Sequence, residues 1–104
     1  MDAIDLSDTP LSLVWDWTRL RLLVEIERQG SVSAAARELG IGQPTASTHL
    51  RRLEESAGQR LVERTGRGST LTEAGRVLSS HAAQAISALR AGEEMARAAG
   101  DSAA

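Results

Sequence analysis

Three glycines divide residues 16–58 into three short segments, each with a helical pattern of apolar side chains. Glycine readily adopts the left-handed backbone conformation that ends a helix, so Gly30, Gly40 and Gly58 mark three predicted helix ends. The starts are marked by residues that commonly cap helices, among them aspartate and serine. The sequence therefore predicts three short helices: one capped by Asp16 and running to about Gln29, one capped by Ser31 or Ser33, and one starting at Gly42 or Gln43.

Within each segment, apolar residues recur three or four positions apart and so define one buried face per helix. The only aromatic residues of the chain are Trp15 and Trp17, so its core must be aliphatic and rich in alanine, which suits closely packed helices. A chain of 104 residues is long enough for one domain. The three predicted faces comprise Leu20, Leu23, Val24 and Trp17; Val32, Ala35, Ala36 and Leu39; and Ala46, Leu50, Leu53 and Ala57.

A hairpin and a long helix follow the third helix. Two short runs with strand propensity, 61–64 and 69–71, flank the turn sequence TGRG. Thr72 can then cap a helix that runs to Ala99, about 42 Å long at 1.5 Å per residue. Steps of four and three along this helix define a narrow seam of mostly small side chains, suited to a close contact between helices. The seam comprises Leu78, Ala82, Ala85, Leu89, Gly92 and Ala96.

The predicted fold is mainly α: a winged helix-turn-helix of three helices and a hairpin, followed by a long dimerisation helix. A helix, a short glycine-containing turn and a second helix form the helix-turn-helix pattern, and the hairpin supplies the wing. The predicted organisation is an N-terminal extension (1–15), the winged helix-turn-helix (16–71), the long helix (72–99) and a tail (100–104).

Charge is unevenly distributed along the chain. The net charge is −2, but residues 1–17 hold four aspartates and no base, which leaves 12 basic and 10 acidic side chains elsewhere. The chain has no cysteine, and its two histidines lack partners at metal-binding spacing, so no cofactor or metal is expected. The N-terminus resembles neither a signal peptide nor a membrane span, so a soluble, cytoplasmic protein is expected.

The third helix carries a polar face opposite its apolar stripe. Short hydrogen-bonding side chains and arginines in such a place can contact the edges of bases in a DNA groove. Taken alone, a polar face of this kind is more often an ordinary solvated surface. The polar face comprises Gln43, Thr45, Ser47, Thr48, Arg51 and Arg52.

From Asp16 to Gly75 the sequence resembles the LysR-type transcriptional regulators. The most specific matching strings are GSVSAAARELGI followed by QPTAS, then LRRLEESAG, LVER and LTEAG, in this order and spacing. The resemblance implies sequence-specific binding of an interrupted palindrome in double-stranded DNA, by a homodimer joined through its last helix. It also implies that this chain lacks the family's effector-binding domain.

Carried over residue by residue, the resemblance assigns the start of the third helix to the major groove. Gln43 can pair with adenine, and Arg51 with guanine or phosphate. Ser33 and Arg52 resemble phosphate contacts, and Arg67 resembles the arginine of the wing. The major-groove residues implied in this way are Gln43, Pro44, Thr45, Ser47, Thr48 and Arg51.

The chain departs from the family pattern at Gly42, where a serine is usual, and residues 1–15 precede that pattern. The alternative function is a protein-interaction module that heterodimerises with a full-length regulator and modulates it. No nucleophile–base pair, metal cluster or phosphate loop points to an enzyme. Arg60, Arg64 and Arg76 are interpreted as partners in surface ion pairs, not as site residues.

Overall fold

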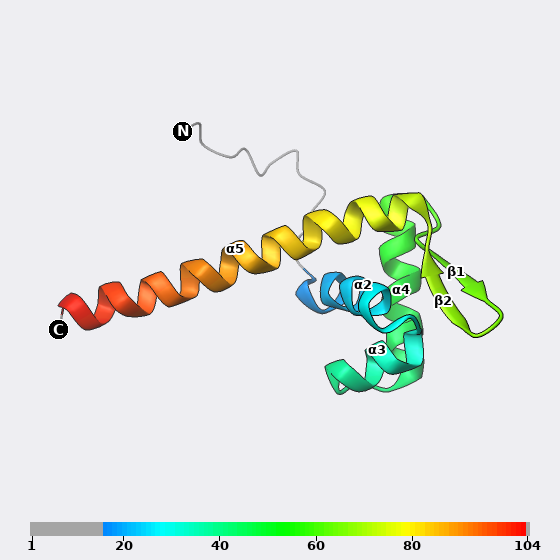
Figure 1. Cartoon of the computed structure of the whole chain (residues 1–104), viewed down its shortest axis with the longest axis horizontal. Helices are drawn as coiled ribbons and strands as arrows, with labels where there is room; N and C mark the ends of the chain where they lie inside the picture. The colour runs from blue at the N-terminus through cyan, green and yellow to red at the C-terminus, as the bar shows by residue number, and fades with distance from the viewer. Residues whose placement is uncertain (1–15, 104) are drawn as a thin grey trace.

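The computed structural model describes residues 16–103, and it contains three short helices, a hairpin and a long helix in the predicted order (Figure 1). The predicted winged helix-turn-helix is therefore confirmed. The elements are α2 (Trp17–Gln29), α3 (Val32–Leu39), α4 (Gln43–Ala57), β1 (Val62–Thr65), β2 (Gly68–Leu71) and α5 (Glu73–Ala103).

The helix ends follow from local capping contacts. The Asp16 carboxylate accepts a hydrogen bond from the Arg19 amide at 3.2 Å. Of the two serines that could cap α3, Ser31 does so, because its Oγ accepts from the Ala34 amide at 2.9 Å. Gly30, the C-cap of α2, has a φ of 75°, in the left-handed region that favours glycine. Side chains thus start α2 and α3, and left-handed glycines end all three short helices, since Gly40 and Gly58 have the same backbone conformation as Gly30.

Helix α2 lies at the centre of the core, where it packs against α3, α4 and α5. Its Leu22, Leu23 and Ile26 are almost completely buried. Ala35 and Ala46 are fully buried, and their small side chains let α3 and α4 approach α2 closely. The core is therefore aliphatic and rich in alanine, as predicted.

Strands β1 and β2 form an antiparallel hairpin in which Val62 pairs with Leu71 and Thr65 with Gly68. The start of β2, next to the tip of the hairpin, lies directly on the turn between α2 and α3. A Cβ at Gly68 would lie 2.3 Å from the Gly30 carbonyl oxygen, and the Ser69 amide donates to that oxygen at 2.9 Å. Only glycine fits at position 68 without movement of the backbone.

Helix α5 begins at the hairpin and extends far beyond the rest of the domain (Figure 1). Thr72 caps it as predicted, since its Oγ1 accepts from the Gly75 amide at 3.0 Å. Ser79, 1% exposed, donates its hydroxyl hydrogen to Glu27 at 2.8 Å and so ties α5 to α2. The helix continues to Ala103, beyond the predicted end at Ala99, because Gly100 keeps a helical backbone instead of the left-handed one that stops a helix.

Candidate nucleic-acid interface

The first turns of α4 are anchored by one small residue and are otherwise open to solvent. Ala46 is fully buried, whereas Gln43, Thr45 and Ser47 are exposed. Gly42 is the N-cap and supplies no side-chain hydrogen bond, and Pro44 lies in the first turn, where a helix amide has no partner to lose. The N-terminal end of α4 therefore presents polar side chains together with the positive end of the helix dipole.

The second half of the polar face is basic. Arg51 and Arg52 are exposed, and Thr48 is half-buried. Arg51 forms an ion pair with Glu55 at 3.8 Å, in which both side chains are about two-thirds exposed. Such a surface pair contributes at most about 1 kcal/mol, so Arg51 can exchange its partner for a phosphate or a base at little cost.

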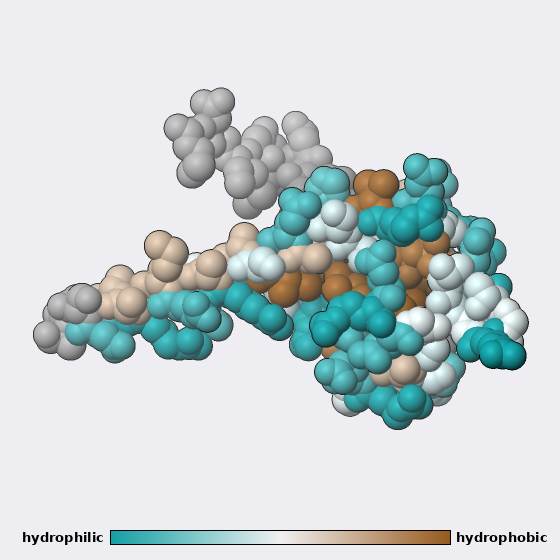
Figure 2. All heavy atoms as spheres, viewed as in Figure 1, coloured by the Kyte–Doolittle hydropathy of each residue, from teal (hydrophilic) through white to brown (hydrophobic). Residues whose placement is uncertain are grey.

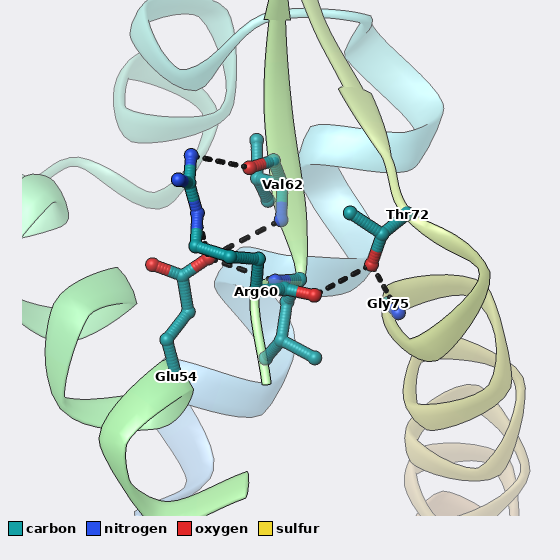
Figure 3. A network of polar contacts seen from close by, with 6 residues as sticks. Glu54, Arg60, Val62, Thr72 and Gly75 are labelled. Atoms are coloured by element: carbon teal, nitrogen blue, oxygen red, sulfur yellow. Dashed lines mark hydrogen bonds and ion pairs between the residues drawn. The ribbon is translucent and has the colours of Figure 1, made fainter. Parts of the chain in front are cut away.

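The Glu54 carboxylate fixes the hairpin against α4, on the same side of the helix as Ser47 and Arg51 (Figure 3). It accepts hydrogen bonds from the amides of Leu61 at 2.8 Å and Val62 at 3.3 Å. Beside it, the Thr72 hydroxyl donates to the Arg60 carbonyl at 2.7 Å, which joins the start of the hairpin to the start of α5. The position of the hairpin relative to α4 is therefore set by hydrogen bonds to its backbone.

Two adjoining hollows lie between α4, the start of α3 and the hairpin; together we name them the wing–helix groove. The first, of about 250 Å³, is lined in part by Ser33, Gln43 and Arg64. The second, of about 170 Å³, is lined in part by Ser47, Arg51 and again Arg64. The groove thus brings together four of the predicted site residues from two helices.

The other predicted site residues line neither hollow. Pro44, Thr45 and Arg52 are exposed elsewhere on α4, where Thr48 is half-buried, and Arg67 lies at the exposed tip between β1 and β2. The interface is therefore a groove with Ser33, Gln43, Ser47 and Arg51 inside it and the remaining predicted residues around it.

Arg64 is the residue of this surface that was assigned to an ion pair from the sequence. In the described part of the chain, residues 16–103, it has no ion pair or side-chain hydrogen bond, and it lines both hollows. The alternation of side chains along a strand indicates on which face of the hairpin Arg64 lies. Residues two apart lie on the same face, so Arg64 shares the face of buried Val62, which is turned toward α4.

The predicted dimerisation seam needs one correction. Ala82 is only 3% exposed, because it packs into the core of its own domain. Leu78 also packs partly against this core. Ala85, Leu89, Gly92 and Ala96 are exposed, so four of the six predicted seam residues remain available to another chain.

A neighbouring seam on α5 is more open. Val77 is 55% exposed and Met95 72% exposed, and both lie on this side of the helix. Figure 2 shows apolar and hydrophilic residues on opposite edges of the projecting half of α5. The outward seam again follows steps of four and three, and comprises His81, Ala85, Ala88, Gly92, Met95 and Ala99, all of which are exposed.

Residues 16–103 contain neither a metal-binding cluster nor a membrane-spanning helix. No three histidine, aspartate or glutamate side chains gather in a way that could hold a metal ion in this range. None of its helices has a stretch apolar and long enough to cross a membrane.

Comparison with known proteins identifies the family. Residues 17–76, more than half of the chain, match the family described as "Bacterial regulatory helix-turn-helix protein, lysR family". The small neutral protease regulatory protein of Streptomyces coelicolor is 43% identical over 79 residues, which are 76% of this chain and 25% of that protein. The regulator BudR of Klebsiella aerogenes is 40% identical over 78 residues, covering 75% of this chain and 54% of BudR. The chain thus spans about a quarter to a half of these relatives.

Solved structures give the same result for the fold. The DNA-binding domain of CbnR, crystallised with DNA, superposes with a TM-score of 0.74 at 28% identity, covering 81% of this chain and 97% of that one. The DNA-binding domain of BenM, crystallised with its catB site 1 DNA, also gives 0.74, at 29% identity over 79% of this chain and 91% of that one. The chain belongs to the lysR family of bacterial helix-turn-helix regulatory proteins.

Proposed function

We propose that this chain binds double-stranded DNA sequence-specifically as a homodimer and acts in transcriptional regulation. The observation that carries the proposal is the wing–helix groove, where Gln43, Ser47, Arg51 and Arg64 converge from α4 and the hairpin. The crystallised DNA complexes of the similar CbnR and BenM domains support it.

In this proposal the N-terminal half of α4 enters the major groove. Gln43, Ser47 and Arg51 contact base edges, because amide, hydroxyl and guanidinium groups match the donors and acceptors displayed there. Ser33 and Arg52 contact phosphates on either side, and Pro44, Thr45 and Thr48 complete the surface against the DNA. The contacts to base edges select the sequence, and the contacts to phosphates set the register of the protein on the DNA.

The hairpin contacts the DNA beside α4. Arg67 at its tip reaches the backbone or a narrow minor groove. Arg64, deeper in the groove, lies between the tip and α4 and contacts the intervening phosphate. Because the Glu54 hydrogen bonds fix the hairpin, these two arginines reach the DNA without a large rearrangement.

The homodimer forms through the outward seam of α5. Ala85, Ala88 and Gly92 are small enough for two helices to approach closely, and Met95 fills the gaps between them. Two α4 helices then enter successive major grooves, with half-sites about 34 Å apart or a multiple of that distance. The same seam could pair with a full-length relative, and sizing the protein alone and in a mixture distinguishes the two assemblies.

The test titrates labelled duplex with variants that leave the fold intact. Arg51→Ala should weaken specific binding by about 1–3 kcal/mol and relax the preference at one base position. Arg64→Ala should weaken binding to all sequences alike. Arg97→Ala, an exposed arginine on the far part of α5, is the matched control and should leave binding unchanged. Equal affinities for all four proteins would contradict the proposal.

A further inference from the structure

A second groove lies on a part of the domain that the proposed DNA contacts do not use. It runs between the start of α2 and the middle of α5 and has a volume of about 550 Å³. It is lined by Trp17, Arg21, Ile86, Leu89, Arg90, Gly92 and Glu93, of which Gly92 also belongs to the outward seam. It shares no lining residue with the wing–helix groove. Figure 1 shows the start of α2 and the hairpin at opposite ends of the domain.

This α2–α5 groove combines apolar surface with two arginines that have no partner among residues 16–103. Leu89 is 60% exposed, and Trp17 and Ile86 are half-buried. Arg21 and Arg90 have no ion pair or side-chain hydrogen bond with any residue from 16 to 103. Glu93, the one acid among the lining residues, is paired with Arg97 at 3.3 Å. The groove therefore suits a ligand with both apolar and acidic groups.

Residues 1–15 have this chemistry. Their N-terminal part contains three aspartates, Asp2, Asp5 and Asp8, and no base, and their C-terminal part is apolar, with the sequence LSLVW at 11–15. The segment joins the domain at Asp16, next to Trp17, which lines the groove. Fifteen residues reach at most about 50 Å when extended, whereas the part of α5 from Ile86 to Glu93 is only about 10 Å long.

We propose that residues 1–15 bind in the α2–α5 groove of their own chain. The apolar segment 11–15 packs against Trp17, Ile86 and Leu89, and Asp5 and Asp8 pair with Arg21 and Arg90. Binding there covers the exposed Leu89 side chain. It also holds the acidic segment away from the wing–helix groove, where its charge would repel phosphates.

The test uses the full chain and its lack of cysteine. Ser7→Cys allows one nitroxide spin label to be placed within residues 1–15, and the loss of amide NMR intensity then maps the residues near it. We expect the amides of Arg21 and of 86–93 to lose most of their intensity, and those of the hairpin tip, 65–68, to keep theirs. No loss on α5 would overturn the proposal.

Two variants test the role of charge. Asp5→Asn combined with Asp8→Asn, which leaves the folded domain untouched, should restore most of the lost intensity on α5. Arg21→Glu combined with Arg90→Glu should do the same, whereas Arg37→Glu, at an exposed position on α3, is the matched control and should leave the intensity loss in place. An unchanged loss in both double variants would overturn the proposal.

A mixed sample separates binding within one chain from binding between two chains. Isotope-labelled chains without the cysteine are mixed with spin-labelled chains that carry no isotope. Binding within one chain is supported if the intensity loss occurs when the same chain carries both the isotope and the spin label, and is absent from the mixed sample. Equal loss in the mixed sample would instead place the segment on a second copy and overturn the proposal.

Discussion

Replacing Glu54 with alanine removes the contact that joins α4 to the hairpin. The carboxylate accepts from the amides of Leu61 at 2.8 Å and Val62 at 3.3 Å, both of which belong to buried residues. Water cannot easily replace the lost acceptor there, so both N–H groups lose a partner. A hydrogen bond to a charged group contributes about 1.5–3 kcal/mol.

The ion pair between Glu54 and Arg60 adds little to this figure. Its atoms are 3.7 Å apart and the arginine side chain is 76% exposed, so solvent screens the pair. Counting one strong and one weaker hydrogen bond, we expect Glu54→Ala to lower the free energy of unfolding by about 2–4 kcal/mol. For a domain of this size that is a decrease in melting temperature of roughly 10 °C or more.

The assay is urea unfolding followed by circular dichroism at one protein concentration, because dimerisation makes apparent stability depend on concentration. Glu55→Ala is the matched control: it removes the adjacent glutamate, which is 64% exposed and forms an ion pair with exposed Arg51. The control should change the free energy of unfolding by less than about 0.5 kcal/mol. Equal stability of the two variants would refute the role of Glu54 in holding the hairpin against α4.

Three further predictions follow from close packing, the outward seam and the hairpin tip. Gly68→Ala forces a Cβ toward a carbonyl 2.3 Å away and should cost about 1–3 kcal/mol in thermal unfolding, whereas Gly66→Ala meets open space and should be nearly neutral; equal melting temperatures would contradict the packing. Ala88→Glu should weaken the dimer in sedimentation analysis, while Ser87→Glu on the adjacent hydrophilic side should not, and a dimer insensitive to both would place the interface elsewhere. Arg67→Ala should weaken binding to all duplexes by a similar factor and reduce the salt dependence, and a loss confined to one base position would argue against a backbone contact.

Much of the local structure could be predicted because single residues determine it. Asp16 and Thr72 start helices through their own side chains, and Gly30 ends one through its backbone conformation. These contacts span only a few residues, so the sequence contains all the information they need. Helix boundaries were accordingly close to those observed, apart from the longer end of α5.

The burial of α2 could not be read from one apolar face. The sequence indicated Leu20, Leu23 and Val24, but Leu22 and Ile26 are buried more deeply than Val24. The reason is that α3, α4 and α5 all pack against α2 and cover more than one side of it. A periodic pattern finds one buried face, and it cannot show how many neighbours a helix has.

The same limit applies to the candidate interface. The polar face of α4 was predictable because its residues fall outside the apolar stripe. Strand alternation places Arg64 on the same face as Val62, but that this face lies beside α4 depends on the Glu54 contact between α4 and the hairpin. Ala82 was assigned to the dimer because two heptad patterns overlap on α5, and only its packing on the domain shows which of them faces outward.

The central claim is that α4 and the hairpin read a DNA sequence as part of a dimer. The most direct measurement selects bound duplexes from a random pool with the purified protein at near-physiological salt, and sequences them. The account predicts an interrupted palindrome whose half-sites lie about one helical turn, or a multiple of it, apart. Folded, dimeric protein that enriches no sequence above background would contradict it.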